Sequence, residues 1–118
     1  MTFPHERFDA WHVARSARKL AFAFTQSLPP GHSAERAQIN QAAASVVRNI
    51  AEGASRWQKR DKAHRFEIAN GEAAEAVSAV QSLLDCGLGD FDLAVQVEDE
   101  LGRVSAMLTG WLRKHRPG

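Results

Sequence analysis

The chain has 118 residues, 44% of them hydrophobic and 25% charged, with a formal net charge of +1. This size and composition predict one soluble domain with a single core and exclude a chain that is disordered throughout. No apolar run approaches the roughly 20 residues of a membrane span, the first residues lack a signal-peptide core, and the single cysteine excludes an internal disulfide, so we expect a cytoplasmic protein.

The first half of the chain predicts a helical hairpin. Apolar residues at steps of three and four, the pattern of an amphipathic helix, predict a helix over residues 6–28, and the Pro-Pro-Gly that follows ends it. A second helix is predicted over residues 34–52, with Ser33 as its N-cap and Gly53 as its C-terminal stop. This second helix carries two apolar faces, which indicates a further packing partner such as another subunit.

The second half predicts another hairpin. A 3-4-3-4 apolar spacing predicts a helix over residues 59–88, and we expect Gly71 within it to allow the close approach of another backbone. A fourth helix is predicted over residues 90–114, with Asp90 at its start. Together the elements predict an all-α fold, an antiparallel up-down-up-down four-helix bundle, with residues 1–118 as a single domain.

The net charge of +1 conceals a strong segregation along the chain. Residues 1–66 carry eleven lysines and arginines against five acidic residues, residues 67–100 carry none against nine, and residues 101–118 carry four against none. In the predicted topology the second-to-third connection and the end of the fourth helix meet at one end of the bundle. We therefore expect a basic end and an acidic end.

Aromatic rings among cations at the basic end are typical of surfaces that bind single-stranded nucleic acid. The candidate nucleic-acid or anion-binding residues are Arg56, Trp57, Lys59, Arg60, Lys62 and Arg65. Cations in the first turn of the third helix oppose its dipole, so they do not serve helix stability. The alternative is an ordinary solvated face. Trp57 is expected to be an interface anchor or an exposed ring, whereas Trp11 and Trp111 lie on apolar stripes and are predicted to be core.

Four polar residues near the end of the second helix predict a structural network. Ser45, Asn49, Glu52 and Arg56 follow one another at three- and four-residue steps, so they share one flank if the helix extends that far. We expect Glu52 to pair with Arg56 or Arg48 and Asn49 to satisfy backbone groups of a neighbouring helix or subunit. The network is predicted to be structural and not catalytic.

The chemistry of most enzyme classes has no counterpart in the sequence. There is no phosphate-binding glycine loop, no Ser/His/Asp or Cys/His set and no metal-ligand spacing, so we expect no cofactor, no metal site and no enzymatic activity. Glu72 and Glu75 share a helical face, but acid–base catalysis by a pair of carboxylates also requires a pocket that holds the substrate.

The chain resembles the four-helix-bundle family named after proteins encoded in 23S rRNA intervening sequences. The residues that carry the resemblance are Gln38, Ile39, Ala42, Ala43, Ser45, the run Asn49 to Gly53, Arg56, Phe66, Ile68, Ala69, Gly71 and Glu75. The resemblance implies a homo-oligomer, a pentameric barrel, mostly without a known activity. Related accessory proteins of diversity-generating retroelements imply RNA, DNA or a reverse-transcriptase-like protein as partner. The chain departs from the family at Asn40 and Gln41, where a basic pair is usual.

Two functional hypotheses follow. The first is a non-enzymatic homo-oligomeric helical scaffold that binds nucleic acid or a nucleic-acid enzyme through its basic end. The second is a protein-interaction module without nucleic-acid binding, in which the extra apolar face of the second helix and Trp57 only build the oligomer. Salt-dependent binding of RNA or DNA separates the two, because phosphate contacts weaken as salt rises.

Overall fold

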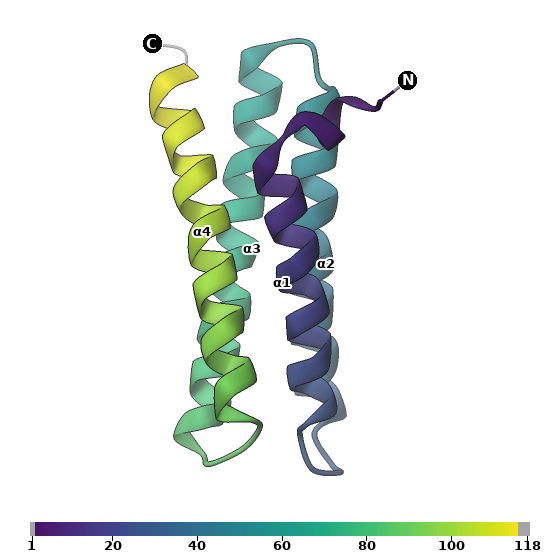
Figure 1. Cartoon of the computed structure of the whole chain (residues 1–118), viewed down its shortest axis with the longest axis vertical. Coiled ribbons are helices and arrows are strands. Elements are labelled where there is room, and N and C mark those ends of the chain that lie inside the picture. The colour runs from purple at the N-terminus through teal and green to yellow at the C-terminus, as the bar shows by residue number, and fades with distance from the viewer. Residues whose placement is uncertain (1, 116–118) are drawn as a thin grey trace.

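The computed structural model describes residues 2–115 and shows helices that run alternately up and down (Figure 1). A short 3-10 turn, η1 (Pro4–Arg7), precedes α1 (Asp9–Gln26), α2 (Ser33–Ser55), α3 (Lys59–Asp85) and α4 (Phe91–His115). Helices that are adjacent in the chain pack against each other, and α1 also packs against α4, which closes the bundle. The predicted all-α antiparallel four-helix bundle is confirmed.

The core follows the predicted apolar stripes and combines buried alanines, most of them on α1 and α3, with larger side chains from all four helices. The buried alanines of α1 and α3 are Ala10, Ala14, Ala17, Ala21, Ala63, Ala69, Ala73 and Ala76. The larger buried side chains of α2 and α4 include Ile39, Val46, Ile50, Val97, Leu101, Val104 and Leu108. Small residues beside large ones allow close helix approach at native packing density. Each fully buried branched side chain contributes about 1.5–3 kcal/mol.

The end of α2 differs from the prediction, because the helix does not stop at Gly53 but continues to Ser55. Gly53 is buried, and no positive φ is found there. A Cβ added to Gly53 would lie 2.6 Å from the Phe66 ring, so the glycine admits that ring instead of terminating the helix. The close approach expected at Gly71 is wrong: nothing lies within 4 Å of a Cβ there, and the residue is exposed.

A glycine does terminate α3, three residues earlier than the prediction. The helix ends at Asp85, and Gly87 follows with φ 74°. The Leu88 N–H donates to the Leu83 carbonyl at 3.0 Å, and the Gly87 N–H donates to the Leu84 carbonyl at 2.9 Å. This pair of bonds is the Schellman motif, which requires a left-handed residue and therefore favours glycine.

The helix starts were predicted with mixed success. α1 begins at Asp9 and not at residue 6, because Pro4–Arg7 forms a separate 3-10 turn. Ser33 is the first residue of α2 and not its cap; His32 occupies the cap position without a side-chain cap bond. The Asp90 carboxylate accepts the Leu93 N–H at 2.8 Å and so caps α4 as predicted. Within residues 2–115 we find no helix with the length and apolar character of a membrane span.

Candidate nucleic-acid interface

The connection between α2 and α3 presents a basic surface at one end of the bundle. Arg56, Trp57, Lys59 and Arg60, which we call the basic connection, are all exposed, and the Trp57 ring is 98% exposed. Within residues 2–115 none of the three cations makes a side-chain hydrogen bond or ion pair, whereas the carboxylates of the chain are concentrated elsewhere. Four of the six predicted anion-binding residues therefore lie together, and their side chains form no hydrogen bond or ion pair within the described residues.

Lys62 lies in the same basic run but serves the fold. Its Nζ donates to the Ala54 carbonyl at 2.9 Å and to the Gly53 carbonyl at 3.3 Å. These are carbonyls of the last turn of α2, which carries the negative end of the helix dipole, and the Gly53 carbonyl also accepts the Arg56 N–H at 3.1 Å. Burial lowers the pKa of the Lys62 ammonium from its ordinary 10.5. Lys62 is thus a C-terminal cap for α2, a role that the charge pattern did not predict.

Arg65 is the second member of the predicted set that the fold uses. Its Nη1 lies 3.0 Å from the Glu52 carboxylate and donates to Asn49 Oδ1 at 3.4 Å. The expected pairing of Glu52 with Arg56 or Arg48 is therefore wrong. Arg65 lies two turns into α3 and reaches across to α2, so it links the two helices instead of facing a partner.

The predicted polar network exists with different members, namely Ser45, Arg48, Asn49, Glu52 and Arg65. The Asn49 amide donates to the Ser45 carbonyl at 2.9 Å and to its hydroxyl at 3.0 Å, and the Arg48 guanidinium donates to the same hydroxyl at 3.2 Å. The Asn49 amide group thus donates within its own helix, and its Oδ1 accepts from the Arg65 side chain of α3 and not from a neighbouring backbone. Arg56 is not part of the network, because α2 ends at Ser55 and the backbone of Arg56 is extended (φ −76°, ψ 150°).

The three tryptophans occupy different environments near the basic end. Trp111 is half-buried and packs edge-on against the fully buried Phe66 at 4.9 Å between centroids. Trp11 is also half-buried, and it contacts His5 at 4.4 Å and the Arg15 guanidinium at 4.7 Å. Both contact the core from its edge instead of lying within it as predicted. Of the three, Trp57 combines a large exposed ring with flanking cations that are unpaired in the described part of the chain.

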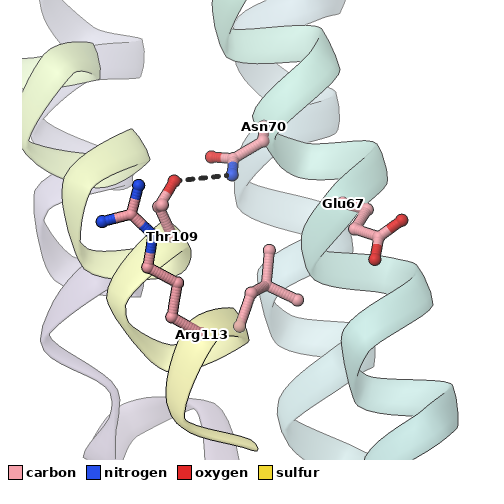
Figure 2. Close-up of a pocket in the computed structure, with 5 residues that line it drawn as sticks. Glu67, Asn70, Thr109 and Arg113 are labelled. Carbon is pink, nitrogen blue, oxygen red and sulfur yellow. Dashed lines mark hydrogen bonds between the residues drawn. The ribbon is translucent and has the colours of Figure 1, made fainter. Parts of the chain in front are cut away.

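A shallow pocket of about 490 Å³ between α3 and α4 was not predicted (Figure 2). Its lining is Glu67, Asn70, Thr109, Leu112 and Arg113. The Asn70 amide donates to the Thr109 hydroxyl at 3.3 Å, and its buried Oδ1 has no hydrogen-bond donor among the described residues. These polar residues lie on the flanks of the apolar stripes, where the sequence pattern distinguishes no pocket from a solvated face.

A second unpredicted feature is a groove of about 800 Å³ on the outer face of α1 and α2. Its lining is Trp11, Arg15, Arg18, Lys19, Phe22, Asn40 and Val47. Glu72 and Glu75 line shallow surface hollows between α2 and α3. Within residues 2–115 no three His, Cys, Asp or Glu side chains are grouped so that they could hold a metal ion.

Comparison with known proteins identifies one family. The model of the 23S rRNA-intervening sequence protein family matches residues 6–110, which extends from η1 to the last turns of α4. No curated protein matches the chain. The matched range includes the basic connection and the polar network, and the description of the family names no enzymatic activity.

Proposed function

The chain belongs to the 23S rRNA-intervening sequence protein family, and we propose that it is a non-enzymatic homo-oligomeric helical scaffold that binds nucleic acid through the basic connection. Its ligand is single-stranded RNA or DNA, held by phosphate contacts to Arg56, Lys59 and Arg60 and by stacking of a base on Trp57. The observation that carries the proposal is the 98% exposure of the Trp57 ring between cations whose side chains have no hydrogen-bond or ion-pair partner within residues 2–115.

The energetics of the basic connection support a binding role. Lys59 and Arg60 lie in the first turn of α3, where positive charge opposes the helix dipole, so the fold gains nothing from them. The carbonyls at the end of α2 are already bonded to Lys62. An exposed indole gains about 1–3 kcal/mol when a base stacks on it, and each phosphate contact releases counterions. An oligomer repeats the surface, which raises avidity without new contacts.

The test is a binding titration of labelled single-stranded RNA and DNA at about 50 and 200 mM salt. We expect the parent to bind and to weaken as salt rises. Replacing Arg56, Lys59 and Arg60 together by glutamine should lower the slope of log K against log salt by about 2, since each contact to a single strand contributes about 0.7. Trp57→Ala should weaken binding by about 1–3 kcal/mol with the slope unchanged.

A matched pair of single variants controls for net charge. Arg60→Gln and Arg103→Gln each remove one exposed arginine, but Arg103 lies along α4 and already pairs with Glu100 at 3.2 Å. Arg60→Gln should weaken binding and Arg103→Gln should not. No binding by the parent at low salt, or equal losses in the two variants, would overturn the nucleic-acid proposal.

The second candidate is a protein-interaction module, and the exposure of Trp57 favours it, because exposed tryptophans are common anchors of protein interfaces. A reverse-transcriptase-like protein with an acidic surface is the partner that this candidate predicts. It requires the parent to bind such a protein through Trp57 while failing to bind RNA and DNA.

A further inference from the structure

We propose that a second copy of this chain docks into the groove between α1 and α2 through the exposed N-terminal half of its α4. The inference rests on the homo-oligomeric part of the proposed function and deepens it, because it names the two surfaces that meet. The contact is heterologous: each copy offers one groove and one α4 surface, and the two surfaces are different.

The first surface is an apolar groove with a cationic rim. Trp11, Arg15, Arg18 and Phe22 recur at helical spacing along the outer face of α1, and Phe22 is 56% exposed. The Arg15 guanidinium covers the Trp11 ring, while Arg18 and the neighbouring Lys19 make no ion pair within residues 2–115. Exposed apolar surface of this kind, rimmed by polar groups, marks an interaction site.

The second surface lies at the start of α4 and consists of Phe91, Asp92, Val95 and Asp99. Phe91 is 67% exposed and Val95 is 36% exposed. Positions 91, 95 and 99 follow at steps of four, so they share one face of the helix. In the described part of the chain, the carboxylates of Asp92 and Asp99 have no ion-pair partner.

The two surfaces are complementary in both polarity and charge. Each has exposed apolar side chains at its centre, and each has unpaired charges beside them, positive in the groove and negative on α4. Contact between the apolar centres would supply affinity, and the opposite charges would select the orientation and speed the encounter. A nucleic acid does not fit the α4 surface, because its phosphates would meet the two aspartates.

The heights of the two surfaces along the bundle also agree. The Asp90 N–H, just before α4, donates at 2.9 Å to a serine hydroxyl directly after α1, so the two helix ends lie at one level. At 1.5 Å per residue, Phe22 and Val95 each lie about 7.5 Å from that level, and Lys19 and Asp99 lie about 12 and 14 Å from it. Two copies side by side with parallel axes thus match Phe22 with Val95 and Lys19 with Asp99.

The two surfaces belong to different sides of the molecule. In Figure 1, α1 and α2 form one side of the bundle and α4 belongs to the other. One copy can therefore engage two neighbours at once. A heterologous contact of this kind forms a ring when the rotation between copies closes, and a filament when it does not.

The experiment blocks one surface at a time. Phe22→Asp places a carboxylate in the groove, and Val95→Asp places one in the centre of the α4 surface. Both residues are exposed, so circular dichroism should show both variants folded. We expect the parent to be oligomeric by light scattering and each variant alone to be monomeric. A mixture of the two should form a heterodimer, because one intact groove and one intact α4 surface remain.

The matched control is Phe3→Asp, which replaces another exposed phenylalanine, 64% exposed, outside both surfaces. It should keep the parent mass. A second check exchanges charges: Lys19→Asp and Asp99→Lys should each weaken assembly, and the double variant should restore it. A monomeric parent, variants that keep the parent mass, or a mixture that fails to form the pair would overturn the inference.

The experiments distinguish failure of the proposed contact between copies from failure of the proposed nucleic-acid binding. The monomeric Phe22→Asp variant keeps the basic connection, so it should still bind a short single strand with the salt dependence of the parent, although it should lose avidity for a long one. A parent that assembles as described but binds no RNA or DNA would refute the proposed function and leave the contact between copies intact.

Discussion

The two ends of the bundle use their polar residues in different ways. At the end that holds the α1–α2 and α3–α4 turns, Arg36 donates to the carbonyls of Thr25 at 3.1 Å and of Leu28 and Pro29 at 2.7 Å. Asp90 caps α4, and its N–H also donates to the hydroxyl of Ser27, directly after α1. At the opposite end, the cations of the basic connection bond to nothing within the described chain.

The difference separates two kinds of charged residue. A charge that satisfies buried carbonyls or caps a helix is part of the fold, because removing it leaves backbone groups without partners. A charge exposed on a connection contributes little to stability and remains available for a ligand. The basic end contains both kinds, since Lys62 and Arg65 belong to the first and the basic connection belongs to the second.

The largest expected effect on stability distinguishes two aromatic residues at the basic end of the bundle. Phe66→Ala should lower the free energy of unfolding by about 3–5 kcal/mol, because Phe66 is fully buried and its ring packs against Phe8 and Trp111. Trp57→Ala should change it by less than about 0.5 kcal/mol. Urea unfolding at one protein concentration measures both. A large loss of stability in Trp57→Ala would show that the ring is buried, as in a subunit interface.

The next largest effect on stability distinguishes two arginines, one at each end of the bundle. Arg36→Ala should lower the free energy of unfolding by about 2 kcal/mol, because three carbonyls lose a charged donor. Arg60→Ala should leave it within about 0.5 kcal/mol of the parent. Thermal unfolding of the two variants side by side gives the comparison. Equal losses would mean that the basic connection is as integrated into the fold as the opposite turn.

The smallest effect concerns the pH dependence that Lys62 imposes. Burial lowers the pKa of its ammonium below the 10.5 of the unfolded chain, so between these two values the unfolded state binds more protons than the folded state. Stability should therefore rise with pH in that window. The chain has no tyrosine to titrate there, and a Cys86→Ser background removes the thiol.

The measurement is unfolding by urea across that pH window, compared with Lys62→Met in the same background. The variant should lose the rise with pH and should also be less stable at neutral pH, since the Ala54 carbonyl loses its side-chain donor and the Gly53 carbonyl keeps only the Arg56 N–H. A parent whose stability falls through the window would contradict the lowered pKa.

The helical periodicity was a good guide to the fold because it reports burial directly. Positions such as Val97, Leu101 and Leu108 repeat at the helical spacing and are all buried in the core. The glycines were a poor guide. Gly53 and Gly71 look alike in sequence, yet one accommodates the Phe66 ring and the other meets open space, because what a missing Cβ admits depends on the neighbouring helix.

The candidate site was predictable as a region but not residue by residue. Charge segregation located the basic end, and Arg56, Trp57, Lys59 and Arg60 are exposed there. The roles of Lys62 and Arg65 were missed, since a lysine that caps α2 and a lysine in solvent have the same local sequence pattern. The groove on α1 was missed for a related reason: Trp11 was assigned to the core stripe, while Arg15, Arg18 and Phe22 lie on the face that periodicity assigns to solvent.

By itself the sequence determined the number and order of the helices, the capping by Asp90 and the segregation of charge, because each depends on residues near one another in the chain. Only the tertiary structure decided which cations are bonded and which are available, where a glycine is required, and which exposed apolar residues form one surface. Those properties depend on distances between α1, α2, α3 and α4, which local sequence patterns do not contain.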